Sequence, residues 1–392
     1  MAVDPMSWRS TASAFMVIAL TACNGSPAAT ERPSVAPGTT PGPSRAHSAT
    51  SGPTPSPLPA VGDLTSANGV VVFATGNTFD GQGQLFTIWP DGSHRHLVAP
   101  DRIAHFALSP DAQRVVIEGA VTAVVGLDGS SYRALELTDI ALGTEFFLWS
   151  SGGDRLIFRG TDEADPTRTG LYSIRAGDPN DLVNLAPGLG PLAVAPTGES
   201  ILAFGDVVAR EGHRDVANLF IVTGSGAFRR VNPEGTAILI EPGFGSAASW
   251  SPDGRYIAFA AFDTADDRDW EQSRSALYVA DAAGTSVQRI TGPEVGAGPT
   301  VRWSPRSEWV ATTGTTGASG GIEEIWLVHP DGTEPHVITA LAAPGTCCPE
   351  WSPDGTRLLG ARLTVFDLDG MEIGRLASDP VSADGYVWVA PS

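Results

Sequence analysis

The chain has 392 residues and carries 24 Lys and Arg side chains against 44 Asp and Glu, a formal net charge of −20. Hydrophobic residues make up 42% of it and charged residues 17%, which permits a large buried core and excludes disorder of the whole chain. All 24 basic residues are arginine, so a Schiff-base lysine and a GxxxxGK[ST] phosphate loop are excluded. The acidic balance also argues against a nucleic-acid partner, because such affinity comes from neutralising phosphates.

Residues 1–22 are expected to form a lipoprotein signal peptide. Ala12–Ala22 is an uncharged, mostly apolar stretch that is too short to span a bilayer. It runs into Leu20-Thr21-Ala22-Cys23, which resembles the bacterial lipobox. The resemblance implies cleavage before Cys23 and lipidation of its sulfur, and hence a membrane-anchored protein of the periplasm or cell surface. The alternative is a short core segment with a chance cysteine.

Residues 23–63 predict a flexible linker. From Asn24 to Gly62 there are nine prolines among Ser, Thr, Gly and Ala, and the formal charges are Glu31, Arg32 and Arg45. Such a segment cannot bury enough apolar surface to fold, and its prolines keep it extended. We expect it to hold a folded domain away from a membrane.

A repeat organises residues 64–392. A large residue followed by a Ser-Pro-Asp-Gly-like turn recurs six times, at intervals of 41 to 56 residues; the first positions are Leu108, Trp149, Val194, Trp250, Trp303 and Trp351. A β-rich run follows each turn, as in Tyr256–Phe259, and then a second hairpin with an Asp-Gly turn, as in Phe366–Gly370. Four short strands at this period are typical of one blade of a β-propeller.

The two ends of the repeat region are expected to pair. Val70–Pro100 supplies three strands of a blade and lacks a leading strand, whereas Tyr386–Pro391 looks like a leading strand, with Val389 aligned to Val194. A terminal strand that completes the first blade removes an open sheet edge. The prediction is an all-β propeller of seven four-stranded blades, with six or eight left open.

The repeated WSPDG, complete at 250–254 and 351–355 and followed by a strand of the LYVxDxDG type, resembles the TolB-type β-propeller family of WD-like repeats. The resemblance covers about residues 64–392. It implies the propeller fold, and the family includes envelope interaction proteins and accessory domains of prolyl-type peptidases. TolB itself has an α/β domain where this chain has the linker.

In such blades the first–second and third–fourth strand turns open on one face, and here they are short. The second–third connections open on the other face and are long: 159–170, 205–218, 263–276 and 313–321. We name this side the long-loop face and the other the short-turn face. Variable loops on a rigid scaffold usually carry binding, so the long-loop face is the expected working surface.

The segment 263–271 carries five carboxylates, which are Asp263, Asp266, Asp267, Asp269 and Glu271. Ca²⁺ prefers several oxygen ligands, but the spacing is not that of a calcium-binding loop. A solvated acidic loop is therefore favoured over a Ca²⁺ site, and no cofactor is expected. With either interpretation the segment attracts a cationic ligand or partner.

One position before each motif is expected to line the central channel; these residues are Ala107, Leu148, Ala193, Ser249, Arg302, Glu350 and Trp388. Arg302 and Glu350 are neighbours in this ring. They are predicted to form an ion pair, with a polar ligand site as the alternative. His105 is expected to be a core histidine.

Two further sequence features could carry chemistry, a pair of cysteines and a G-x-S-x-G match. For Cys347 and Cys348 a vicinal disulfide, paired thiols and an intermolecular bridge are open, with the disulfide favoured in an oxidising compartment. Gly317–Gly321 fits G-x-S-x-G but lies in a loop between two strands, whereas a nucleophile elbow needs a strand before and a helix after it.

The expected function is therefore a non-enzymatic, lipid-anchored scaffold that recognises an envelope protein or small ligand, of cationic character. The alternative is a propeller enzyme of the lyase, lactonase or glycosidase kind, metal-assisted through segment 263–271, with its site at the channel mouth. A purely structural spacer is the third hypothesis.

Overall fold

The structure is a computed structural model. It describes residues 69–75, 83–119, 121–137, 140–142, 147–162, 164–178, 180–208, 215–239, 247–263, 275–292, 295, 297–315, 323–340, 349–360, 363–376 and 381–390. Regular structure in these ranges is almost entirely antiparallel β-strand, with a short 3-10 helix, η2 (Pro166–Arg168), between two strands.

The strands form five hydrogen-bonded sheets. The first is β29 (Val381–Val389), β1 (Val70–Thr75), β2 (Gly83–Ile88), β3 (His96–Leu108), β4 (Arg114–Gly119), β5 (Ala123–Gly126) and β6 (Arg133–Ala134). The second is β11 (Leu182–Pro187), β10 (Gly170–Arg175) and β9 (Arg155–Thr161), with β7 (Ala141–Leu142) and β8 (Leu148–Trp149) both on β9.

The third sheet is β12 (Gly190–Val194), β13 (Ile201–Val208), β14 (Val216–Val222), β16 (Thr236–Leu239), β18 (Tyr256–Asp263), β19 (Ala276–Asp281) and β20 (Val287–Arg289). Two further strands join it: β15 (Phe228–Arg230) on β14 and β17 (Ala248–Trp250) on β18. The fourth is β21 (Ala297–Trp303), β22 (Val310–Thr315), β23 (Glu323–Val328) and β24 (His336–Ala340); the fifth is β25 (Glu350–Trp351), β26 (Arg357–Gly360), β27 (Thr364–Asp367) and β28 (Glu372–Arg375).

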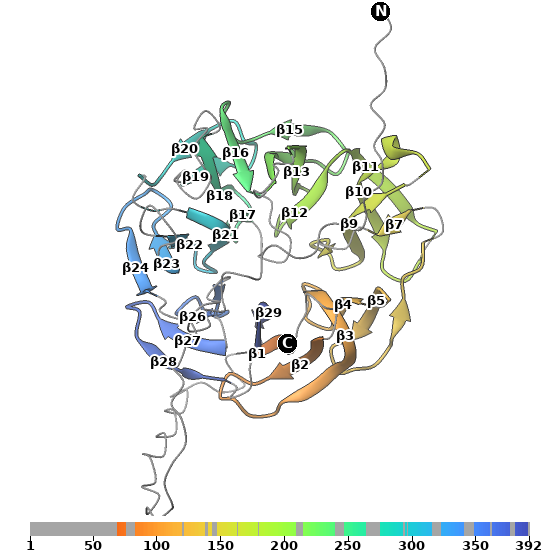
Figure 1. Ribbon diagram of the computed structural model, residues 1–392, viewed down its shortest axis with the longest axis horizontal. Helices are drawn as coiled ribbons and strands as arrows, with labels where there is room; N and C mark the ends of the chain where they lie inside the picture. Colours follow the sequence, from red (N-terminus) through yellow and green to blue (C-terminus); the bar gives the residue numbers. More distant parts are fainter. Residues whose placement is uncertain are drawn as a thin grey trace, which may run out of the picture. The chain divides into compact units, whose positions relative to one another are not determined.

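Within the unit Pro57–Ser392 the sheets follow one another around a common centre, with β12, β17, β21 and β29 near it and β20, β24 and β28 at the rim (Figure 1). The predicted β-propeller fold is confirmed. Two features join neighbouring groups: β3 pairs with β2 through its first half and with β4 through its second, and β16 lies between β14 and β18. Divided there, the described strands form seven groups, as a seven-bladed ring requires; the blade number itself stays a prediction.

The predicted pairing of the two ends is also confirmed. Strand β29 runs antiparallel to β1, with Phe73 opposite Tyr386 and Val71 opposite Trp388. The edge of β1 that faces the centre is thereby covered, as ring closure requires.

The register of this pair corrects one alignment. Where the motif is present, its first residue Trp303 lies opposite Val310, which in turn lies opposite Val328, just before a Pro-Asp-Gly turn. Trp388 stands in the same relation to Val71, which lies opposite Ile88 just before the equivalent turn, and Trp388 is 5% exposed; Trp388 and not Val389 therefore takes the motif's first position. The sequence alignment was wrong by one residue because it followed Ala390-Pro391, and Val387 replaces Trp388 in the inner ring.

Local chemistry explains the repeated turn. In the copy that begins at Trp250, the Ser251 hydroxyl accepts from the Tyr256 amide at 2.9 Å and donates to Asp253 Oδ1 at 2.7 Å. Gly254 has φ +70°, the left-handed region that glycine tolerates best. The turn therefore satisfies its own polar groups and directs the following strand back along the first.

The core lies between neighbouring groups. Trp250 and Phe259 pack with Leu202 and Phe204 of the preceding group in one buried cluster. Trp149 joins Val116 and Phe158 in the equivalent place between two earlier groups. Alternate residues of each second strand thus face opposite neighbours, which fixes the angular order of the sheets.

Candidate functional site

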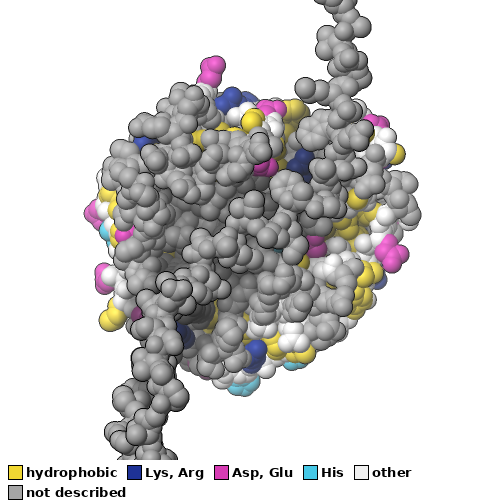
Figure 2. All heavy atoms as spheres, viewed as in Figure 1, with side chains coloured by type: hydrophobic (Ala, Val, Ile, Leu, Met, Phe, Trp, Pro, Cys, Tyr) yellow, Lys and Arg dark blue, Asp and Glu magenta, His cyan; other side chains and the backbone are white. Residues whose placement is uncertain are grey.

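The strand order confirms which segments join second to third strands. The connections between β9 and β10, β13 and β14, β18 and β19, and β22 and β23 correspond to the four long segments predicted from the sequence, and the last of them extends one residue further, to 322. Figure 2 shows acidic, basic and histidine side chains interspersed around the coloured rim of one face.

On the short-turn face the carboxylates are used within the turns. Ser109 donates to Asp111, and Ser93 donates to Asp91 through both its amide and its hydroxyl. These hydrogen bonds hold the pKa of each carboxyl below its usual range. In Asp253 the bonds from Ser251 and Arg255 lower the pKa to about 2. These aspartates therefore serve the turns.

On the long-loop face, the connection from β9 to β10 is fixed by one buried carboxylate. Asp162 is 5% exposed, accepts from the amides of Ala164 and Asp165 at 2.9 and 3.0 Å, and pairs with Arg168 at 2.8 Å. The Tyr172 hydroxyl then donates to the Arg168 carbonyl. Asp162 thus joins the start of this connection to Arg168 near its far end.

A short strand that the sequence did not predict ties two groups together. In β16, Ala237 lies opposite Phe262 of β18 and Ile238 lies opposite Ala217 of β14. We call β16 the strap. Buried Asn232, just before the strap, accepts from the Leu219 amide at 2.8 Å and donates to the Thr236 carbonyl at 2.6 Å. An isolated Thr-Ala-Ile-Leu is too short to be predicted as a strand from its own pattern.

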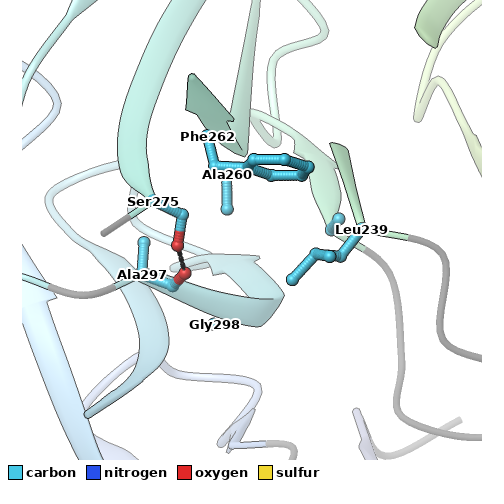
Figure 3. A pocket seen from close by; sticks show the side chains of 7 residues that line it. Leu239, Ala260, Phe262, Ser275, Ala297 and Gly298 are labelled. Atoms are coloured by element: carbon cyan, nitrogen blue, oxygen red, sulfur yellow. Dashed lines mark hydrogen bonds between the residues drawn. The ribbon is translucent and has the colours of Figure 1, made fainter. Parts of the chain in front are cut away.

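The strap borders a small apolar recess (Figure 3), whose lining residues are Leu239, Ala247, Ala260, Phe262, Ser275, Ala297 and Gly298. The recess is too narrow to hold a water molecule. The Ser275 hydroxyl points across it to the Ala297 carbonyl and donates to it. The recess is therefore a narrow apolar seam between strands, and its one hydroxyl is already hydrogen-bonded.

The acidic segment starts beside this recess. Asp263 is the last residue of β18, and its backbone lies opposite Thr236 of the strap. Asp266, Asp267, Asp269 and Glu271 lie outside the described residues. In the part of the chain that the structure describes, no three His, Cys, Asp or Glu side chains are grouped to hold a metal ion. The Ca²⁺ interpretation stays a prediction.

The inner ring, corrected for Val387, consists of half-buried residues: Ala107, Leu148, Ala193, Ser249, Arg302, Glu350 and Val387. The predicted ion pair is present, with Arg302 Nε donating to Glu350 Oε1 at 2.9 Å. The indole of Trp351 also donates to the Arg302 carbonyl at 3.3 Å, as that of Trp149 does to Ala107 at 2.9 Å. Neighbouring groups are therefore linked at the centre.

His105 lies on β3, opposite Glu118 of β4. It is half-buried, and burial lowers the pKa of its imidazole because the charged form loses hydration. Arg302 also donates through Nη1 to the Val301 carbonyl at 3.2 Å.

Three further predictions lie outside the described residues: lipidation at Cys23, pairing of Cys347 with Cys348, and the G-x-S-x-G match at 317–321. The described residues contain no helix with the length and apolar character needed to cross a membrane.

Comparisons with known proteins bear on the fold. No family model matches the sequence, and no curated protein matches it. Among solved structures, an oligogalacturonate lyase in complex with manganese has a TM-score of 0.57 at 13% identity, covering 79% of this chain and 85% of its own. The oligogalacturonate lyase of Vibrio parahaemolyticus gives 0.55 at 10% identity, covering 81% and 90%.

TolB from Acinetobacter baumannii gives a TM-score of 0.44 at 14% identity, covering 70% of this chain and 65% of that one. This chain thus spans just under two thirds of the length of that TolB. At such identities a structural likeness shows the fold alone, and the fold that the lyases share with this chain is the one that its strand order gives: the chain is a β-propeller.

Proposed function

We propose that this chain is a lipid-anchored β-propeller that recognises an envelope protein or a small ligand without catalysing a reaction. The observation that carries the proposal is the contrast between the two faces. On the short-turn face the carboxylates accept hydrogen bonds within their own turns. On the long-loop face the connections are longer, and the scaffold next to them is stabilised by Asp162 and by the strap. Binding surfaces are commonly built from loops held on rigid elements.

The partner that fits best carries positive charge. The formal net charge is −20, and segment 263–271 of the long-loop face contains five carboxylates within nine residues. A surface of one sign raises the encounter rate with a partner of the opposite sign, an effect that salt screens. Binding to the long-loop face should therefore weaken as ionic strength rises.

The anchor is proposed from Cys23 and the preceding lipobox-like residues, with 23–63 as the tether that places the propeller outside the cytoplasm. Substitution Cys23→Ser removes the thiol that would be lipidated, and the protein should then leave the membrane fraction. A Cys347→Ser variant is the matched control and should stay there. An unchanged membrane fraction for Cys23→Ser would contradict the anchor.

The working face is tested by crosslinking in intact cells. Residues 264–274 are replaced by a short Gly-Ser linker in one variant, and Met371→Ala changes an exposed residue of the short-turn face in a second. The proposal requires crosslinked partners to be lost from the first variant and kept in the second. Equal recovery from both would assign binding elsewhere.

The enzymatic alternative has one observation in its favour: the backbone of Asp263, where the acidic segment begins, pairs with Thr236 of the strap, which borders the recess. Carboxylates gathered there would suit a divalent cation, which polarises a substrate oxygen. Tight Ca²⁺ or Mn²⁺ binding that Asp266→Ala and Asp267→Ala abolish, together with cation-dependent turnover, would favour this function over recognition.

A further inference from the structure

The inner ring is aliphatic at most of its positions. Four of its seven positions carry alanine, leucine or valine and a fifth carries Ser249. The two charged members, Arg302 and Glu350, are adjacent, and their side chains are 24% and 19% exposed. Charges so placed lose part of their hydration, which an ion pair recovers only in part.

The fold has other means of joining these two groups. The Trp351 indole already donates to the Arg302 carbonyl, as Trp149 does to Ala107 where the ring carries alanine and leucine. Because aliphatic residues suffice at equivalent positions, the charged pair is not needed for closure. The pair is therefore available for a role other than closure.

The polar atoms of Arg302 and Glu350 differ in whether they have a hydrogen-bond partner among the described residues. Arg302 donates through Nε to Glu350 Oε1 and through Nη1 to the Val301 carbonyl at 3.2 Å. The Ser249 hydroxyl already accepts a hydrogen bond from the Trp303 amide at 3.2 Å. For Glu350 Oε2, no donor is found among the described residues, although a carboxylate oxygen accepts two hydrogen bonds. An acceptor is therefore open on a half-buried anion.

The inner-ring residue of the group that follows Glu350 is aliphatic. Strand β29 contacts β25, and Val387 is its ring residue, followed around the ring by Ala107. A group that binds at Glu350 thus meets a negative acceptor on one side and aliphatic carbon beside it.

We propose that the inner ring binds the protonated amine of an alkylammonium group, such as a basic side chain, with N–H donated to Glu350 Oε2 and the alkyl part against Val387. An anionic ligand is disfavoured because the Arg302 guanidinium is already neutralised by Glu350. This site is separate from the long-loop face, so either proposal can fail while the other holds.

The test uses the full chain and four small probes in ligand-detected NMR or calorimetry at low ionic strength. Butylammonium is the positive probe, tetramethylammonium keeps the charge but has no N–H, methylammonium lacks the alkyl chain, and butyrate reverses the charge. The expected order puts butylammonium first, and Glu350→Gln should weaken it about tenfold, as the loss of one charge-assisted hydrogen bond predicts. Glu372→Gln, an exposed carboxylate that pairs with Arg375, should leave it unchanged.

Val387→Phe is a second variant, which keeps the carboxylate and fills the space beside it, and it should also reduce binding. The proposal is overturned if Glu350→Gln and Val387→Phe both bind butylammonium as the parent does. It is equally overturned if tetramethylammonium or butyrate binds as well as butylammonium, or if Glu372→Gln loses as much affinity as Glu350→Gln, because the attraction would then be unspecific.

Discussion

Trp388 lies directly opposite Val71 in the ladder between β29 and β1, and both side chains are buried, at 5% and 0% exposure. The contact joins residues near the two ends of the propeller unit. Trp388 and Val71 share a cluster with Leu359 and Val365 of the last sheet. The tryptophan thus fills the space between the closing strand and the group before it.

Substitution Trp388→Ala should destabilise the protein by about 3–5 kcal/mol, because a large aromatic side chain is lost from a packed interface and a cavity remains. Denaturant unfolding measures the loss, and hydrogen exchange of the β1 amides should rise with it. Tyr132→Ala is the control, since Tyr132 is 61% exposed, and it should change the stability by less than about 0.5 kcal/mol. Equal effects of the two substitutions would contradict the closure described here.

The motif and the end-to-end pairing could be predicted because each rests on local chemistry. Ser-Pro-Asp-Gly specifies a turn by itself, and a missing leading strand at one end matched a spare one at the other. The one-residue error at Trp388 arose where the Ser-Pro-Asp-Gly turn is lacking, so the sequence had no local mark of register. Hydrogen bonding between strands far apart in sequence decides such a register.

The candidate site was predictable only in part, for the same reason. Arg302 and Glu350 each stand one place before a motif, so their proximity followed from the repeat. The strap and the bracing role of Asp162 could not be predicted, because they depend on which backbone groups tertiary packing leaves unpaired. Val387 entered the ring only after the register was known.

Glycine should stabilise the turn at the fifth position of the motif in those copies that carry another residue there. Ala112 and Ser307 occupy it with φ +53° and +61°, while Gly153, Gly254 and Gly355 do so at similar angles. A left-handed conformation costs an L-residue roughly 1–2 kcal/mol, partly offset by the larger chain entropy that glycine loses. We expect Ser307→Gly to stabilise the protein by about 0.5–1 kcal/mol in denaturant unfolding.

The reverse change provides its control. Gly254→Ala places a Cβ at φ +70°, 2.7 Å from the Thr197 hydroxyl oxygen, and should destabilise by about 1 kcal/mol or more. If both substitutions shift the unfolding midpoint in the same direction, backbone conformation does not explain the glycine preference of this turn.

The turn aspartates predict how stability depends on acid. Hydrogen bonds from Ser109 and Ser251 hold the pKa of Asp111 and of Asp253 below the usual 3.8, that of Asp253 at about 2. The unfolded chain therefore binds more protons than the folded one in this range, so stability rises with pH. The contribution is fully present above about pH 4 and is lost as the pH falls toward 2.

Unfolding free energies measured between about pH 5 and pH 2 should show this slope. Asp253→Asn should make the slope shallower, whereas Glu136→Gln, an exposed carboxylate outside the turns, should leave it unchanged. A slope that is the same for Asp253→Asn and the parent would assign the acid sensitivity to other groups.

The strap should depend on Asn232 more than on its own short sequence. Asn232 is 3% exposed and satisfies the Leu219 amide and the Thr236 carbonyl, so Asn232→Ala leaves two backbone groups in a buried place without their partner. Each such group costs about 1–3 kcal/mol. Hydrogen exchange should show the amides of 236–239 losing protection by more than the global stability falls, because the strap opens while the sheets beside it remain.

Asn184→Ala is the matched control: Asn184 is exposed, with one long bond of 3.4 Å to the Arg168 carbonyl, and should change neither quantity. Loss of protection spread evenly over β14, β16 and β18 would mean that Asn232 supports the whole sheet, and that the strap has no separate stability of its own.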